Sequence, residues 1–133
     1  MLNAIFHNST VPMLQEVVNF AESRHAVLAG NVANFDTPDY RIRDLSVDTF
    51  QERLKEAIAE NKSPRSMGQP QGTDDPLRRV RDSLTTILRH DGADISIEHQ
   101  VAEISKNQAL HNTAIAIMSS QFRMLETAIS ERV

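Results

Sequence analysis

The chain of 133 residues has no cysteine and no tryptophan, and its aromatic side chains are limited to one tyrosine and five phenylalanines. The absence of cysteine excludes disulfides and thiolate metal sites. The shortage of aromatics leaves little large apolar area to bury, so contacts between helices must supply most of the core. No apolar stretch approaches the roughly 20 residues of a membrane-spanning helix.

Positive charge is also in short supply. The formal net charge is −4, which argues against a nucleic-acid binder that works by neutralising phosphates. Arg78, Arg79 and Arg81 form the one basic cluster, and because acidic residues flank it we interpret it as a solvated surface. Residues 1–8 lack the basic start and apolar core of a signal peptide. These features predict a cytoplasmic protein, unless it leaves the cell by a route without a cleaved signal.

The residues needed for catalysis do not form a recognisable site. None of the five histidines belongs to an H-E-x-x-H pattern. Glu22-x-x-His25 is one copy of a di-metal helix signature, but that site needs a second copy. No glycine-rich phosphate loop, nucleophile elbow or Ser/His/Asp arrangement can be assembled. We therefore expect no enzyme, no cofactor and no metal, and we interpret His25 and His111 as polar residues that set helix register.

The two ends of the chain have the periodicity of amphipathic helices. Pro12 suits a helix start, and the first helix should end near Asn34 because the turn chemistry of 36–39 follows. Its heptad-like line is Leu14, Val18, Ala21, His25, Leu28, Val32 and Phe35. Ser96 can cap the last helix. Its line is Ile97, Val101, Ile104, Gln108, His111, Ile115, Met118, Phe122, Leu125 and Ile129.

The last helix carries more apolar surface than the first can cover. A second stripe consists of Leu110, Ala114, Ile117, Met124 and Ala128. A helix over 96–131 spans about 54 Å, whereas one over 12–34 spans about 35 Å. We expect the lines through His25 and through Gln108 and His111 to pair within the chain. The second stripe is the better candidate for contact with other subunits.

The centre of the chain is less regular. Asp48 can cap a short helix over 49–60, in which Phe50, Leu54 and Ile58 recur at helical spacing. Residues 61–75 collect proline and glycine and predict a mobile loop. Residues 76–90 fit either a helix that begins at Pro76 or a strand near 85–88, and Asp91-Gly92 should end whichever element forms.

These patterns predict a mainly α fold. The long N- and C-terminal helices pair as a coiled-coil-like hairpin, with an irregular, partly disordered central segment. The expected organisation is an N-terminal helix and turn over 1–44, a variable centre over 45–95 and a C-terminal helix over 96–133. Both ends together form one assembly domain.

Residues 28–44, LAGNVANFDTPDYRIRD, carry a recognisable motif. They resemble the A-x-N-(I/L)-A-N-x-x-T-P-G-Y signature of bacterial flagellar rod and hook axial proteins. The Arg43-Asp44 continuation, the chain length and the 106–125 stretch most resemble the family of flagellar basal-body rod protein B. Asp39 departs from the usual glycine, and Ala93 from the asparagine of many relatives. The matching motif residues are Ala29, Asn31, Ala33, Asn34, Asp36, Thr37, Pro38 and Tyr40.

The resemblance implies a structural subunit of the proximal rod. Such proteins polymerise through their terminal helices, help to transmit torque from the membrane ring to the hook and are required for motility. They leave the cell through the flagellar type III export apparatus without a cleaved signal and are located in the basal body. The implied partners are other rod subunits, further copies of the chain, the membrane–supramembrane ring and rod-adaptor proteins, with no nucleic acid and no small-molecule substrate.

Two alternatives stay open. The chain could be a soluble helical adaptor or export chaperone that forms a closed dimer. The motif itself could be only a well-made helix exit, or it could also contact a neighbouring rod subunit or a ring component.

Overall fold

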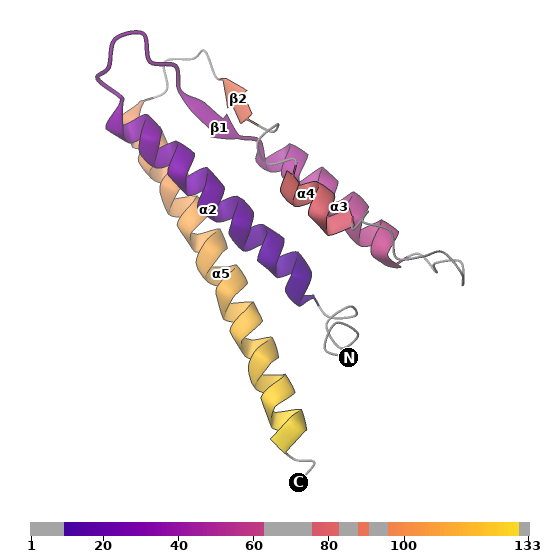
Figure 1. Ribbon diagram of the computed structural model, residues 1–133. Coiled ribbons are helices and arrows are strands. Elements are labelled where there is room, and N and C mark those ends of the chain that lie inside the picture. Colours follow the sequence, from indigo (N-terminus) through magenta and orange to yellow (C-terminus); the bar gives the residue numbers. More distant parts are fainter. Residues whose placement is uncertain (1–9, 63–75, 83–87, 91–95, 131–133) are drawn as a thin grey trace.

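The computed structural model describes residues 10–62, 76–82, 88–90 and 96–130. Their elements in chain order are α2 (Val11–Ala33), β1 (Arg43–Leu45), α3 (Val47–Lys62), α4 (Pro76–Asp82), β2 (Leu88–His90) and α5 (Ile97–Ser130). Helix dominates, and the two longest helices stand near the two ends of the chain (Figure 1). The predicted mainly α fold is therefore confirmed.

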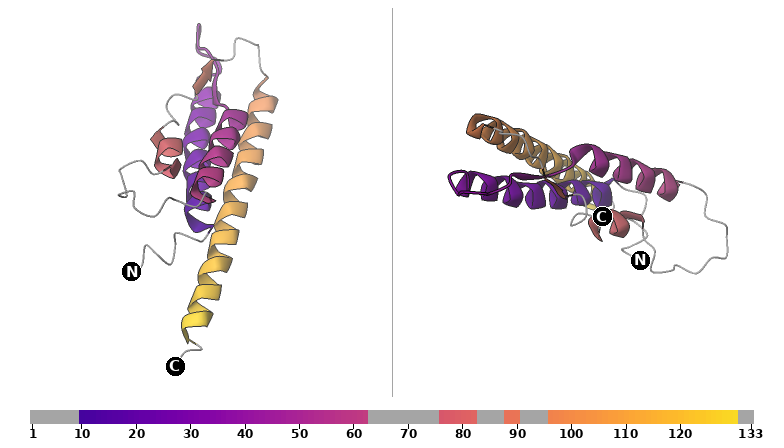
Figure 2. Two further views of the ribbon diagram at one scale, coloured as in Figure 1. Left: turned by 90° about the vertical axis from the view of Figure 1, so that its right-hand side faces the viewer. Right: turned by 90° about the horizontal axis from the view of Figure 1, so that it is seen from above.

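α2 and α5 lie side by side and antiparallel, and their contact is the largest between any two of the described elements (Figures 1 and 2). α5 has 34 residues and α2 has 23, so α5 continues past the N-terminal end of α2. Gln121 of α5 donates to the hydroxyl of Thr10, the residue before α2, which marks where the pairing stops. The predicted mismatch in helix length is present.

The ends of the long helices follow local hydrogen-bonding chemistry. Pro12 lies in the first turn of α2, where no intrahelical donor is needed. At the other end, Asn34 donates to the carbonyl of Gly30 from both its backbone N–H, at 3.1 Å, and its Nδ2, at 2.8 Å. The Oγ of Ser96 accepts from the backbone N–H of His99 at the start of α5. The predicted ends at Asn34 and Ser96 are confirmed.

The cap of α3 differs from the prediction. The Oγ of Ser46 accepts from the backbone N–H of Thr49 at 3.3 Å and lies 2.9 Å from the Thr49 hydroxyl. Asp48 lies further in, within the first turn of the helix. Ser46 is the cap because its side chain reaches the third helical N–H. The carboxylate of Asp48 instead favours the positive end of the helix dipole.

The central elements form a core on α2. Phe20 of α2 stacks on Phe50 of α3 with ring centroids 4.0 Å apart and planes 10° from parallel. α3 and α4 pack against each other and against α2 (Figure 2). The buried core residues are Phe20, Leu45, Phe50, Ala57, Leu77 and Val80. In the described part of the centre, residues from three helices and one strand thus share one apolar cluster.

Residues 76–90 contain both of the elements that the sequence left open. α4 begins at Pro76, and β2 follows at Leu88. β2 pairs antiparallel with β1, which sets Arg43 opposite His90 and Leu45 opposite Leu88. The predicted loop at 61–75 lies outside the described residues from 63 onward, and so does the predicted stop at Asp91-Gly92.

Asp39 has φ +61°, the left-handed conformation that glycine adopts at no steric cost. The turn therefore accommodates an aspartate side chain where the motif usually has glycine. Aspartate visits this region more readily than most residues because its short polar side chain bonds locally.

We expect Asp39→Ala to lower the free energy of unfolding by about 1 kcal/mol, because alanine has no such compensation. Asp39→Gly removes the backbone strain in the folded chain, but glycine also gives the unfolded chain more conformational freedom. The free energy of unfolding should therefore rise, by no more than about 1 kcal/mol. Urea denaturation followed by circular dichroism ranks the three proteins. An alanine variant as stable as the glycine variant would contradict this account of the turn.

Candidate functional site

The motif asparagine Asn31 lies at the centre of a buried polar junction, and its side chain is fully buried. Its Nδ2 donates to the backbone carbonyl of Arg43 at 2.6 Å and to Oε1 of Gln100 at 3.0 Å. Its Oδ1 accepts from the backbone N–H of Arg43 at 3.1 Å and from the hydroxyl of Tyr40 at 3.2 Å. Every donor and both acceptor positions of the amide are used.

This junction holds three elements in one geometry. The Asn31 amide pairs with both backbone groups of Arg43, as a neighbouring strand would, and so fixes the start of β1 against α2. Its remaining donor reaches Gln100, which is buried on α5. Because a fully satisfied buried polar network is directional, it specifies how the helix exit, the strand and α5 meet.

An ion cluster about two helical turns from Asn31 along α2 joins the same three elements, α2, β1 and α5. Arg24 of α2 forms a bidentate pair with Asp44 of β1, at 2.8 Å and 2.6 Å, and contacts Glu103 of α5 at 2.7 Å. The Arg24 side chain is 8% exposed. Its hydrogen bonds to Asp44 raise the pKa of Arg24, although burial opposes this. Lys106 and then Arg24 lower the pKa of Glu103, because both favour the carboxylate.

The predicted motif residues divide between two environments. Asn31, Asn34 and Tyr40 make the inward contacts described above. The remaining motif side chains are exposed; these are Ala29, Ala33, Asp36, Thr37 and Pro38. The inward set accounts for the helix exit. That the outward set contacts a neighbouring subunit stays a prediction.

The contact between α2 and α5 runs along a polar line of α5. The buried residues of α5 are Gln100, Asn107 and Ala114, spaced by seven. The Nδ2 of Asn107 donates to the backbone carbonyl of Ala21 at 2.7 Å. The short side chain of Asn107 reaches a backbone carbonyl of α2, which requires the two backbones to lie close together there.

The predicted apolar line of α5 borders this contact only in part, and the prediction was wrong for those of its members that are exposed. In α2, Leu28 is buried, and Leu14, Val18 and Val32 are half-buried. In α5, Ile104, Met118 and Leu125 are half-buried. The exposed members of the α5 line are Ile97, Val101, Ile115, Phe122 and Ile129.

The second predicted stripe is largely exposed as well. Ala114 packs toward α2, whereas Leu110, Ile117 and Met124 are exposed. α5 thus presents apolar side chains on both flanks of its contact with α2. Their role as subunit contacts stays a prediction.

The two histidines of the helix pair lie around one pocket. Its volume is about 270 Å³, and it is lined by Ala21, Glu22, His25, Asn107, Gln108 and His111. The Nε2 of His111 is 3.9 Å from a carboxylate oxygen of Glu22. The structure therefore brings His25, Gln108 and His111 together between α2 and α5.

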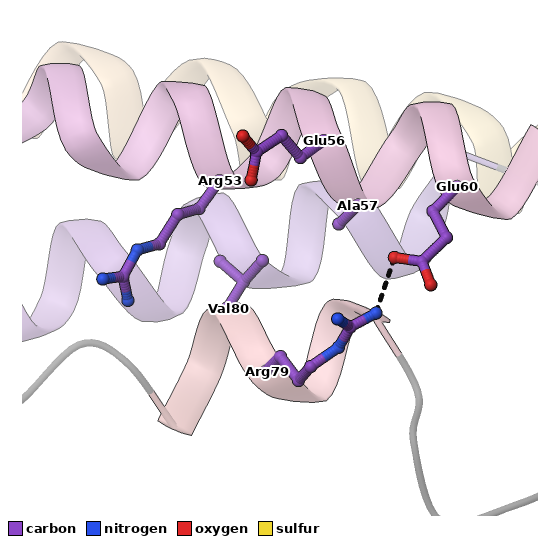
Figure 3. Close-up of a pocket in the computed structure, with 6 residues that line it drawn as sticks. All are labelled: Arg53, Glu56, Ala57, Glu60, Arg79 and Val80. Carbon is purple, nitrogen blue, oxygen red and sulfur yellow. Dashed lines mark hydrogen bonds and ion pairs between the residues drawn. The ribbon is translucent and has the colours of Figure 1, made fainter.

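The arginine cluster is tied into the fold more closely than a solvated surface would be. Arg81 pairs with Glu16 of α2, which is only 2% exposed. Arg79 pairs with Glu60 of α3 at 2.5 Å (Figure 3). Figure 3 shows this pair at the rim of a pocket of about 240 Å³ between α3 and α4, with Ala57 and Val80 in its lining. The arginines hold α4 to its neighbours.

Neither a membrane-spanning helix nor a metal-binding group is found in the described part of the chain. None of the helices described is long and apolar enough to cross a membrane. Among the same residues, no three histidine, aspartate or glutamate side chains are grouped as a metal ion would need.

Sequence reasoning overlooked the polar residues that hold the helix pair, namely Arg24, Gln100, Glu103 and Asn107. A signal was present in the seven-residue spacing of Gln100, Asn107 and Ala114. It was missed because polar residues on an amphipathic helix are usually assigned to solvent.

The described residues define a mainly helical hairpin protein, in which the exit of the N-terminal helix is locked to the C-terminal helix by a polar motif. No family model matches the chain. It is 27% identical to flagellar basal body rod protein FlgB of Aquifex aeolicus (strain VF5), over 92% of this chain and 94% of the relative. FlgB of Bacillus subtilis (strain 168) is 21% identical, over 92% and 95%. FlgB of Borrelia hermsii is 25% identical, over 90% and 95%.

These similarities, at 20–27% identity over about nine tenths of the chain, support the family of flagellar basal body rod protein FlgB. The similarity spans nearly the whole length of the relatives, so it includes α2, the motif and α5 together. No solved structure matches the chain.

Proposed function

We propose that the protein is a structural subunit of the proximal rod of the bacterial flagellar basal body, and not an enzyme. The observation that carries the proposal is the whole-length similarity to FlgB proteins of several bacteria. In this role it helps to transmit torque from the membrane ring to the hook, and motility depends on it.

The arrangement of α5 supports assembly through the terminal helices. Exposed apolar residues flank its contact with α2, and its C-terminal part continues beyond the start of α2. An apolar surface of this kind on a helical protein marks an interaction site. Because the flanks differ from each other, each meets a different face of a neighbour, and such head-to-tail contacts build filaments.

The proposal extends to organisation and partners. Residues 1–44 and 96–133 act as one assembly unit, and 45–95 is the variable central segment, of which α3 and α4 contact α2. The partners are other rod subunits, further copies of this chain, and the ring and rod-adaptor proteins. The chain reaches them through the flagellar type III export apparatus.

A charge placed on the second stripe should abolish assembly. In the source bacterium, with the variant as its sole copy, we expect Ile117→Asp/Met124→Asp to eliminate swimming and the basal bodies counted by electron microscopy. The reason is that desolvating two carboxylates at a packed interface costs several kcal/mol each.

The matched control is Ala116→Asp. Residue 116 is also exposed, and it lies opposite Asn107 on the helix, away from both apolar flanks. It should leave swimming intact at an equal cellular level of the protein. A swimming Ile117→Asp/Met124→Asp strain would overturn the proposal, and so would a wild-type protein found only as a soluble closed dimer.

A further inference from the structure

α5 carries two competing lines for contact with α2. The inner line contains Gln100, Asn107 and Ala114, which are buried. The outer line is displaced by one residue from the inner line and has the same seven-residue spacing. It consists of Val101, Gln108, Ile115, Phe122 and Ile129. A rotation of α5 by about 100°, the angle between successive residues, would exchange them. Burial of apolar surface by itself favours the outer line, yet Val101 is 52% exposed.

Polar contacts select the inner line. Asn107 donates to the carbonyl of Ala21, and Gln100 accepts from Asn31. Glu103, on the same side of the helix, pairs with Arg24. Rotating α5 would break all three contacts and would leave Arg24 and Asn31 buried without their partners on α5.

Asn107 lowers the stability of the isolated chain. It is 2% exposed, and among the described residues its Oδ1 has no hydrogen-bond partner. A buried acceptor without a partner is destabilising. A buried asparagine in a helix pair is the type of residue that fixes register at a cost in stability.

We infer that Gln100 and Asn107 determine which face of α5 packs against α2, and that they thereby keep the apolar outer line directed outward for the helix of a neighbouring subunit. The second half of this inference rests on the proposed function. The first half concerns the folded chain alone.

The rotation can be measured by thiol labelling, because the chain has no cysteine of its own. Ala114→Cys reports on the inner line and Ile115→Cys on the outer line, since residue 114 is 3% exposed and residue 115 is 42% exposed. In the parent chain, the thiol of Ile115→Cys should react with a maleimide at least about tenfold faster than the thiol of Ala114→Cys. In the Gln100→Ala/Asn107→Ala background, both hydrogen bonds to α2 are lost and the inner line gains little apolar surface, so this ratio should fall at least about tenfold while the helices are retained.

Gln100→Leu/Asn107→Leu is the matched control. It removes the same hydrogen bonds but makes the inner line apolar, so the parent ratio should persist. A double-alanine variant that keeps the parent ratio, or that loses its helical circular dichroism, would overturn the inference. Labelling does not require assembly. A chain that shows the expected ratios but never enters a basal body would contradict only the proposed function.

Discussion

Replacing Asn31 with alanine is expected to lower the free energy of unfolding by about 3–5 kcal/mol. The substitution removes the partners of both backbone groups of Arg43 and of the Gln100 side chain, all at a fully buried position. Each buried polar group left without a partner costs about 1–3 kcal/mol. Because whole domains are stable by only about 5–15 kcal/mol, this single change should remove a large part of the total.

Asn34→Ala is the comparison within the same motif. Asn34 loses one side-chain bond to Gly30, and its backbone N–H keeps the same acceptor. We expect a loss of about 1 kcal/mol. Urea denaturation of both variants gives the two values. Equal losses would show that Asn31 is no more than a helix-end residue.

Arg24→Met should be the second most damaging substitution at the junction, with a loss of about 3 kcal/mol at neutral pH. It leaves Asp44 and Glu103 facing each other without the cation between them. Removing one partner of a buried pair costs more than the pair contributes, because the remaining charge stays partly desolvated. Asp44 is 34% exposed, so the loss should not exceed this range.

The pH dependence of this variant gives a second readout. Lys106 and Arg24 lower the pKa of Glu103, so this carboxyl stabilises the fold above its unfolded-state pKa of about 4.3. That contribution is lost as the pH falls through the lowered, folded-state pKa. Arg24→Met removes one cause of the lowering, so the variant should lose less stability than the parent between about pH 5 and about pH 3.

Lys106→Met provides the control for this pH profile. Its hydrogen bond lowers the pKa of Glu103 most, but the Lys106 side chain is 70% exposed, and water screens such pairs. We expect it to cost about 0.5 kcal/mol or less at neutral pH. Urea denaturation at each pH measures these differences. An Arg24→Met variant as stable as Lys106→Met would contradict the importance of the buried cluster.

The sequence predicted the helices well because their signals are local. Pro12, Asn34 and Ser96 mark helix ends by their own chemistry, and the structure has ends there. The face of α5 that meets α2 could not be predicted in the same way. Apolar periodicity favoured the line through Val101 and Ile115, whereas hydrogen bonds to Ala21 and Asn31 select its neighbour.

The function of the motif was predicted only in part, for a related reason. Asn34 acts locally and could be interpreted from its position at a helix end. Asn31 bonds to Gln100, 69 residues away in the chain, so its role depends on the tertiary fold. The contact between Arg24 and Glu103, which are 79 residues apart, depends on the tertiary fold in the same way.

Photo-cross-linking in living cells tests the central claim most directly, namely that this chain is built into the rod through the flanks of α5. A photoreactive phenylalanine derivative replaces Ile117 in one strain and Ala116 in another, and basal bodies are isolated after irradiation. We predict that position 117 forms cross-links to another copy of the chain or to a second rod subunit, and that position 116 forms far fewer. Equal cross-linking at the two positions, or products found only with soluble proteins outside the basal body, would contradict the account.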